Sequence, residues 1–204
     1  MGDIVIKNLN KAFDGKPVLR NLSLRIPSGR CFAIMAPSGY GKTTLLRILM
    51  GFERADSGSI DGLEGQRLSA VFQEDRLCEH LSALQNIRLV RPELPRDAMV
   101  GALRNVGLAD CCDQPVRELS GGMRRRAALV RALMAQYDVL ILDEPFKGLD
   151  EETKALVIRE TRERIAGKTA VMVTHDPKEA EAMGAEVVAL ESAADVQPGE
   201  RPAE

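Results

Sequence analysis

A glycine-rich loop between an apolar strand and a helix is the feature that most restricts how this chain folds. Residues 36–43 read Ala-Pro-Ser-Gly-Tyr-Gly-Lys-Thr, which matches the spacing of a phosphate-binding loop except at its first position. Cys31–Met35 is predicted to be the buried strand before this loop, and Lys42–Met50 the helix after it. Strand, loop and helix together are the context that the motif requires.

The residue types of the loop suit the binding of phosphate. Gly39 and Gly41 allow consecutive backbone amides to curl around an anion. Lys42 supplies a cation for the terminal phosphates of a nucleotide, and the Thr43 hydroxyl can bind Mg²⁺. The predicted nucleotide-binding segment comprises Ala36, Pro37, Ser38, Gly39, Tyr40, Gly41, Lys42, Thr43 and Thr44.

Two further motifs follow along the chain. Ser120-Gly121-Gly122 opens a basic helix, where Ser120 can act as N-cap and the glycines leave backbone N–H groups open to phosphate. The apolar run Val139–Leu142 ends in adjacent carboxylates. Asp143, at the strand tip, is placed to hold Mg²⁺ through water. Glu144, with its side chain on the opposite side of the strand, is suited to accept a proton from attacking water. Alone, the pair would equally fit two carboxylates that cap a loop.

In this order and spacing, the segments resemble the ATP-binding cassette family, the ATPase subunits of membrane transporters. The resemblance extends from about Ile4 to His175, which is most of the chain. Other landmarks of the family are matched by Gln73 (Q-loop), Lys147-Gly148-Leu149-Asp150 (D-loop), His175 (switch histidine) and Phe13 (adenine-stacking aromatic residue), with Val18 beside Phe13.

The resemblance implies roles that the residues alone would leave open. A glutamine at a strand end is usually a surface residue, and a lone histidine usually fills a polar niche. Here Gln73 would join Mg²⁺ to a helical subdomain, and His175 would bond the terminal phosphate and fix the water. Phe13 would stack on the base, worth about 1–3 kcal/mol without strictly excluding GTP.

The chain departs from the family pattern at three positions. Ala36 stands where glycine is usual, which is tolerable if its φ is below zero. Tyr40 is bulky for a position usually held by a small residue, and Arg125 replaces a glutamine. Because successive helical residues are about 100° apart, Arg124–Arg126 should fan outward as a solvated or partner-facing helix surface.

The family also implies partners. Two copies would pack head to tail, so that Ser120, Gly121 and Gly122 bind the γ-phosphate held by the partner's Lys42. ATP would close this pair and hydrolysis would reopen it, driving an integral membrane permease docked near Gln73, with a solute-binding protein involved indirectly. The protein would then lie on the cytoplasmic face of the membrane. Residues 71–77 and 145–146 most resemble the nitrate, sulfonate and taurine importer branch.

Composition sets further bounds. A formal charge of −2 over 204 residues and a pI near 5.9 argue against a nucleic-acid surface. The four cysteines lack metal-site spacing, and no apolar run approaches the roughly 18 residues of a membrane span. Only 29 residues follow His175, so we expect no appended regulatory domain.

Strands that alternate with helices predict an α/β fold with a mostly parallel sheet. We expect a phosphate-loop core with an antiparallel β subdomain (1–72 and 134–191), an inserted helical subdomain (73–133) and an unfolded tail (192–204). Ile4–Lys7 and Leu19–Ile26 should be strands, and residues 57–62 a short hairpin.

Two other functions remain open at this point. One is a soluble cassette ATPase that acts on nucleic acid or ribosomes. Such proteins usually have two cassettes or long coiled coils, and neither is evident here. A nucleotide-dependent regulator without turnover is disfavoured by the intact Glu144 and His175. The sequence does not indicate which solute is carried, and the direction of transport rests on the resemblance alone.

Overall fold

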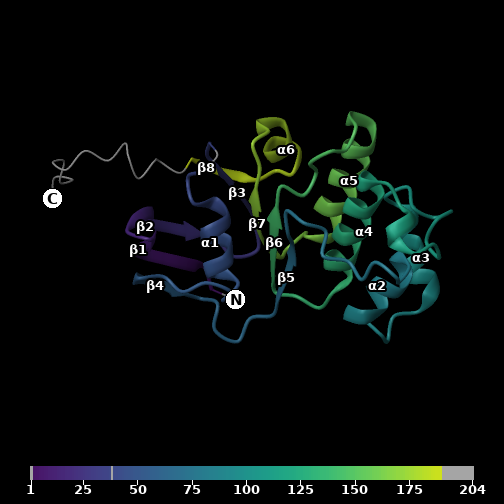
Figure 1. Cartoon of the computed structure of the whole chain (residues 1–204), viewed down its shortest axis with the longest axis horizontal. Helices are drawn as coiled ribbons and strands as arrows, with labels where there is room; N and C mark the ends of the chain where they lie inside the picture. Colours follow the sequence, from purple (N-terminus) through teal and green to yellow (C-terminus); the bar gives the residue numbers. More distant parts are fainter. Residues whose placement is uncertain (1, 38, 190–204) are drawn as a thin grey trace.

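The computed structural model describes residues 2–37 and 39–189 (Figure 1). Ser38 of the glycine-rich loop, Leu190 at the end of the strand that the sequence predicts for residues 186–190, and the predicted unfolded tail (192–204) lie outside the described residues. The strands are β1 Ile4–Phe13, β2 Lys16–Ile26, β3 Cys31–Met35, β4 Ser57–Asp61, β5 Leu68–Val71, β6 Val139–Asp143, β7 Thr169–Val173 and β8 Glu186–Ala189. The helices are α1 Lys42–Leu49, α2 Ala83–Val90, α3 Arg96–Arg104, η1 Val116–Glu118, α4 Gly121–Met134, α5 Glu151–Arg164 and α6 Pro177–Ala182.

Five strands form one sheet in the order β5-β6-β7-β3-β8. Every neighbouring pair in it is parallel, which confirms the predicted fold class. The central strands β6, β7 and β3 are apolar except for Thr169 at the start of β7 and Asp143 at the end of β6, because both faces of such a sheet are covered. The strand before the glycine-rich loop runs over Cys31–Met35 as predicted, and the helix after it ends one residue earlier than predicted.

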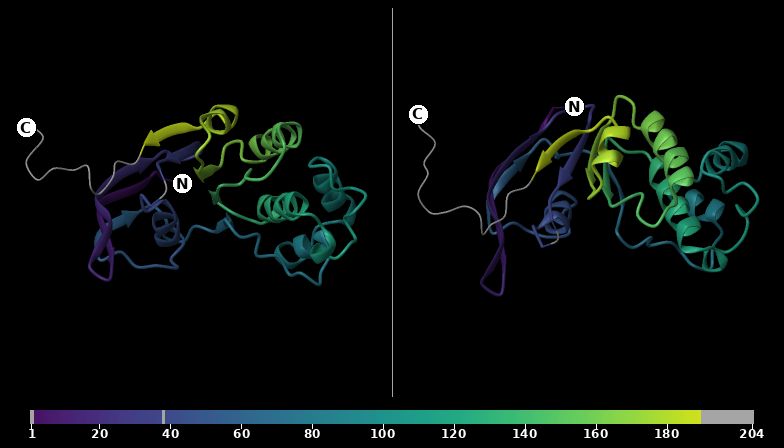
Figure 2. Two further views of the ribbon diagram at one scale, coloured as in Figure 1. Left: turned by 45° about the horizontal axis from the view of Figure 1, so that its top comes forward. Right: turned by 90° about the horizontal axis from the view of Figure 1, so that it is seen from above.

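Alternate side chains of the parallel sheet enter two separate cores. Cys31 and Ala33 pack with the helices α2 to α6, whereas Phe32 and Ile34 pack with α1 and the strands β1 and β2. This division follows from the period of two along a strand. The helix after the glycine-rich loop, α1, and the helix after the Ser-Gly-Gly turn, α4, therefore lie on opposite faces of the sheet (Figures 1 and 2).

The second sheet is antiparallel, in the order β2-β1-β4, and its strand β1 continues past Lys7 to Phe13. The predicted hairpin at residues 57–62 is wrong, because this segment is the single strand β4 and pairs with β1. Gly58 has a φ of 96°, and a Cβ there would lie 2.5 Å from the Asn8 carbonyl oxygen. The long β1 strand offers its free edge, so β4 finds its partner there instead of folding back on itself.

Residues 73–133 contain α2, α3, η1 and most of α4, but regular helix begins only at Ala83. The preceding loop is fastened by the fully buried Asn86, whose side chain accepts a hydrogen bond from Cys78 N (2.9 Å) and donates to Ser82 O (3.0 Å). Ser82 and Gln85 form a capping box at the start of α2. The described helices include none that is long and apolar enough to cross a membrane.

Candidate nucleotide-binding site

The predicted site residues follow the carboxyl ends of four parallel strands. The glycine-rich loop follows β3, Gln73 follows β5, Glu144 follows β6 and His175 follows β7. Pairing of Asp143 with Val173, and of Val173 with Ile34, brings three of these ends into line. The edge formed by strand carboxyl ends is where open α/β sheets bind their ligands.

The glycine-rich loop has the backbone that its sequence predicts. Gly39 and Gly41 have φ values of 88° and 76°, and a Cβ on Gly41 would lie 2.8 Å from Val18 O. Val18 therefore lies against the loop, near the place where it was expected to line the nucleotide surface. Ala36 is not one of the described residues that have a positive φ. An alanine is therefore compatible with the fold at this position, where the family usually has glycine.

Lys42 turns its ammonium into the loop. Its Nζ donates to Ala36 O at 2.5 Å and to Pro37 O at 2.8 Å, and the residue is buried. Burial lowers the pKa of Lys42, while the nearby carboxylates of Glu144 and Asp143 act in the opposite direction. Two backbone oxygens of the loop thus satisfy the ammonium of Lys42.

The three predicted metal ligands line one hollow of about 780 Å³, at the carboxyl edge of the sheet: Thr43, Gln73 and Asp143. Burial raises the pKa of Asp143, as does Glu144, and Arg125 and Lys42 partly offset this. Among the described residues no group of three or more His, Cys, Asp and Glu side chains could hold a metal by itself. The donor set still fits Mg²⁺, which typically takes one or two carboxylates and completes its shell with substrate phosphates and water.

Glu144 is held by the side chains of Lys147 and His175. Its Oε2 lies 2.7 Å from Lys147 Nζ, and its Oε1 lies 2.9 Å from His175 Nε2. Its φ of 47° shows that the strand ends at Asp143, so the expected alternation across the strand does not direct this side chain. Lys147 was named only as part of the D-loop, and sequence reasoning missed its pairing with Glu144. Its place three residues after Glu144, in the turn that follows the strand, is the signal that could have found it.

We expect Lys147→Ala to move the acid limb of the pH–rate profile upward. Burial raises the pKa of Glu144, but Lys147 and His175 lower it by more, so the net shift is downward. Removing Lys147 takes away the largest lowering contribution. A proton acceptor must be ionised, so activity should be lost at a higher pH than in the wild type. Lys147→Arg is the matched control and should keep the wild-type limb; an unchanged limb in the alanine variant would contradict this assignment.

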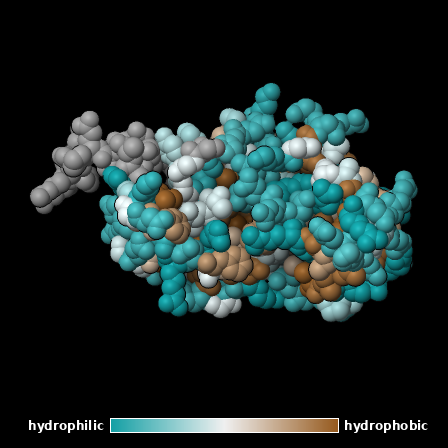
Figure 3. All heavy atoms as spheres, viewed as in Figure 1, coloured by the Kyte–Doolittle hydropathy of each residue, from teal (hydrophilic) through white to brown (hydrophobic). Residues whose placement is uncertain are grey.

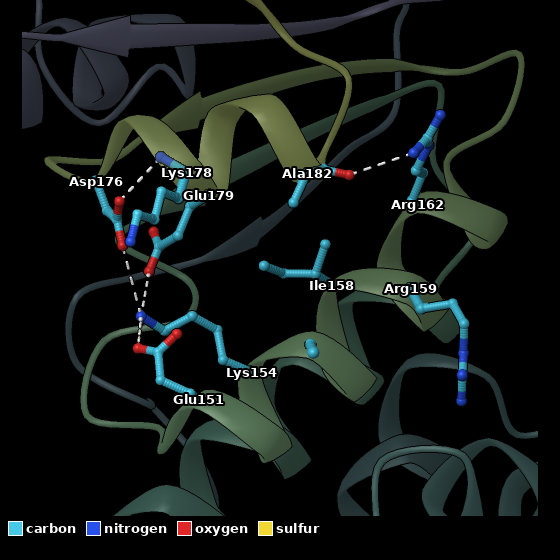
Figure 4. Close-up of a pocket in the computed structure, with 10 residues that line it drawn as sticks. Glu151, Lys154, Ile158, Arg159, Arg162, Asp176, Lys178, Glu179 and Ala182 are labelled. Atoms are coloured by element: carbon cyan, nitrogen blue, oxygen red, sulfur yellow. Dashed lines mark hydrogen bonds and ion pairs between the residues drawn. The ribbon is translucent and has the colours of Figure 1, made fainter.

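The turn that holds His175 is anchored between α5 and α6 (Figure 4). Lys154 of α5 lies 3.6 Å from Asp176 and 3.3 Å from Glu179, and the Thr174 hydroxyl donates to Glu179. A hollow of about 460 Å³ next to these pairs is lined by residues of α5, α6 and Asp176, and by none of the predicted site residues. We therefore infer that Lys154, Asp176 and Glu179 hold the turn that carries His175 in place.

The Ser-Gly-Gly turn and the D-loop lie side by side, away from the glycine-rich loop. Ser120 accepts a hydrogen bond from Met123 N (3.3 Å) as the N-cap of α4, as its sequence predicted. Asp150 caps α5 by accepting from Thr153 N (2.9 Å). A Cβ on Gly122 would lie 3.5 Å from Leu149 Cδ2. No contact recorded among the described residues joins this turn to Lys42, which belongs to the other face of the sheet.

Phe13 is exposed at the end of β1, with 43% of its surface accessible. Lys11 Nζ lies 4.9 Å from the centre of its ring. An exposed ring of this kind can take a base on its face, and its role with adenine stays a prediction.

The expectation of a solvated arginine surface is wrong for Arg125. This residue is only 5% exposed, whereas Arg124 and Arg126 are half-buried. Ala128, Leu129 and Ala132 lie three, four and seven residues further on and are buried, so Arg125 is the first residue of a buried stripe along α4. The small or apolar residues at these three positions are the sequence signal that could have revealed the burial of Arg125.

A phosphate-loop sheet with this loop, this carboxylate pair and a Ser-Gly-Gly helix start defines a nucleotide-hydrolysing protein. A family model described as ABC transporter matches residues 19–147. An aliphatic sulfonates import ATP-binding protein, SsuB 2, from Agrobacterium fabrum is 40% identical over 196 residues, covering 91% of this chain and 75% of that protein. The chain therefore belongs to the ABC transporter family, as an ATP-hydrolysing subunit.

Other proteins extend the comparison. The sulfate/thiosulfate import ATP-binding protein CysA of Escherichia coli is 39% identical over 209 residues, covering 92% of this chain and 57% of that protein. A dimeric bacterial ABC transporter cassette, MJ0796, superposes with a TM-score of 0.81 at 26% identity, covering 92% of this chain and 94% of that one. An ATP-bound Atm1-family exporter, at 24% identity and a TM-score of 0.83, shares the fold.

Proposed function

We propose that this chain powers an importer of small sulfur oxyanions by pairing head to tail with a second copy around ATP. The observation that carries this proposal is the division of the site between the two faces of the sheet. Lys42 lies on the α1 side and Ser120 on the α4 side, so one copy does not enclose a nucleotide with both. A second copy, turned head to tail, can supply the missing half to each site.

Within each composite site we assign separate roles. Lys42 and the amides of the glycine-rich loop bind the phosphates, and Phe13 with Val18 supports the base. Thr43, Gln73 and Asp143 would hold Mg²⁺, which neutralises phosphate charge when bound. Glu144 accepts the proton of the attacking water, and His175 orients the water and the terminal phosphate. Ser120, Gly121 and Gly122 of the partner subunit, with its Asp150 nearby, close the site.

The surface around Gln73 is suited to a permease. The hollow that Gln73 lines also includes Phe52, which is 59% exposed and lies 6.0 Å from the Phe72 ring, measured between ring centres. Leu89 and Val90 of α2 are 58% and 41% exposed. Figure 3 shows apolar side chains gathered over α2 and between α1 and β5. We propose that an apolar cytoplasmic segment of the permease docks here, holding the protein at the membrane surface.

The solute class is taken from the relatives. The relatives named above are import ATP-binding proteins for aliphatic sulfonates and for sulfate or thiosulfate, which share a sulfur oxyanion. A solute-binding protein would deliver the anion to the permease. In this proposal, residues 73–133 form the helical subdomain that moves with the permease, and the rest of the described chain forms the core.

A complementation experiment tests the composite site. Lys42→Ala disables the loop half of a site and Ser120→Arg disables the turn half, so each variant alone should release almost no phosphate. In a mixture, the loop of the Ser120→Arg copy meets the intact turn of the Lys42→Ala copy. We expect phosphate release from the mixture to exceed the sum of the separate rates. A mixture whose rate of phosphate release only equals that sum would contradict the head-to-tail pair. The control is wild-type protein at the same dilution as each variant in the mixture.

A further inference from the structure

Arg125 joins the two loops that hold the proposed catalytic groups. Its Nη2 donates to the carbonyl oxygens of Asp143 and Glu144, both at 2.6 Å, and its Nε donates to Pro145 O at 3.2 Å. On the other side, its Nη1 donates to Phe72 O and to Gln73 O, the latter at 3.4 Å. Five main-chain oxygens from two separate loops therefore converge on one buried guanidinium.

A buried charge is stable only when its donors are satisfied. Arg125 meets this requirement through carbonyl oxygens, with a single carboxylate, Asp75 Oδ1, at 3.4 Å. The fork of an arginine carries five N–H donors in a fixed plane, whereas a glutamine amide has two. The two N–H donors of a glutamine, the residue usual at this position in the family, are fewer than the five carbonyl oxygens that converge here. The arginine thus adds a connection that the resemblance does not imply.

The position of Arg125 extends this connection to a third element. It lies in the second turn of α4, the helix that Ser120 caps and that starts with the Ser-Gly-Gly turn. Glu144, whose carbonyl it binds, has a φ of 47°, a conformation that non-glycine residues rarely adopt without support from their surroundings. Hydrogen bonds to Asp143 O, Glu144 O and Pro145 O hold the main chain on both sides of this residue.

We propose that Arg125 is a positioning residue for hydrolysis: it locks the main chain of Gln73 and that of Asp143–Pro145 together and ties both to α4. This proposal rests on the proposed function. In the head-to-tail pair, α4 presents its turn to the ATP of the partner, while Gln73 and Glu144 serve the ATP of their own copy. Movement of the turn in one site is therefore passed to the hydrolysis groups of the other site through this one side chain.

Two substitutions separate positioning from simple packing. Arg125→Gln restores the usual residue of the family and removes the charge, and Arg125→Lys keeps the charge and loses the fork. We expect both to lower kcat for ATP by about 10- to 100-fold, the size of effect that misplaced catalytic groups produce. KM and the equilibrium affinity for ATP should change by less than about twofold, because the hydrogen bonds of Arg125 to described residues go to the loops of Gln73 and Glu144 and not to the described part of the glycine-rich loop. Arg164→Gln, which removes a partly buried arginine at the end of α5, should leave kcat unchanged.

Hydrogen exchange of the nucleotide-free protein gives a readout that does not need turnover. In both variants the backbone amides of residues 73–77 and of residues 144–147 should exchange faster than in the wild type. Exchange of the amides of α1 should not change. If the glutamine variant does not fold, the lysine variant decides. A wild-type kcat in Arg125→Lys, or faster exchange confined to α4, would overturn the proposal. Absence of phosphate release from the wild type would instead overturn the proposed function, and the exchange experiment would still test Arg125.

Discussion

Glu144→Gln should reduce phosphate release by about 10²–10⁴-fold, the usual contribution of a general base. The amide has nearly the shape of the carboxylate, so the turn after β6 should keep its fold. Its oxygen can still accept from His175, which lies 2.9 Å from Glu144 Oε1 in the wild type. The variant loses the proposed proton acceptor, whereas Lys42 and the loop amides to which we assign ATP binding are untouched.

The same variant should accumulate as an ATP-bound pair, since hydrolysis is the step that reopens it. Size-exclusion chromatography with ATP and magnesium, compared with ADP, measures this directly. Glu152→Gln is the matched control, because it neutralises an exposed glutamate eight residues further on, in the first turn of α5, and should behave as wild type. A Glu144→Gln protein that stays monomeric with ATP and magnesium would count against Glu144 as the general base and against the head-to-tail pair around ATP.

Lys42→Ala should weaken ATP binding by about 100-fold or more. The ammonium is buried and donates to Ala36 O and Pro37 O, so it is already held at the centre of the loop. Phosphate oxygens would replace these neutral carbonyls and carry negative charge, so the exchange strengthens the hydrogen bonds of the ammonium. A net gain of about 2.8 kcal/mol from this exchange corresponds to a 100-fold change in affinity.

Isothermal titration with ATP and magnesium measures the affinity directly and does not depend on turnover. Lys178→Ala removes a lysine from α6, at the hollow beside α5, and should bind ATP like the wild type. Thermal unfolding of both variants checks that the fold survives. Wild-type affinity in a folded Lys42→Ala protein would show that the loop does not bind the phosphates through this lysine.

Much of the fold could be predicted because its signals are local. The apolar run Cys31–Met35, the glycines after it and the helix from Lys42 are adjacent in sequence, and each was predicted within a residue or two. Ser120 as an N-cap depends on the next three residues only. The hairpin prediction at 57–62 failed for the opposite reason, since the partner of that segment is a strand more than forty residues away.

Within the site, the chemistry of single residues was evident but the contacts between them were not. Glu144 could be recognised after an apolar strand, yet its positive φ and its bonds to Lys147 and His175 depend on how three loops meet. Arg125 was expected on a solvated or partner-facing helix surface because three consecutive arginines on a helix point in different directions. Its burial depends on the carbonyl groups that β5 and β6 bring to that point.

The amino-acid sequence by itself determined the phosphate-loop fold, the order of the motifs and the types of group that handle ATP, because these follow from short-range spacing and residue chemistry. Only the tertiary structure decided that α1 and α4 occupy opposite faces of the sheet and that Arg125 bridges the loops of Gln73 and Glu144. Both depend on parallel strands from distant parts of the chain being paired in register. No local pattern specifies that pairing until the whole sheet has formed.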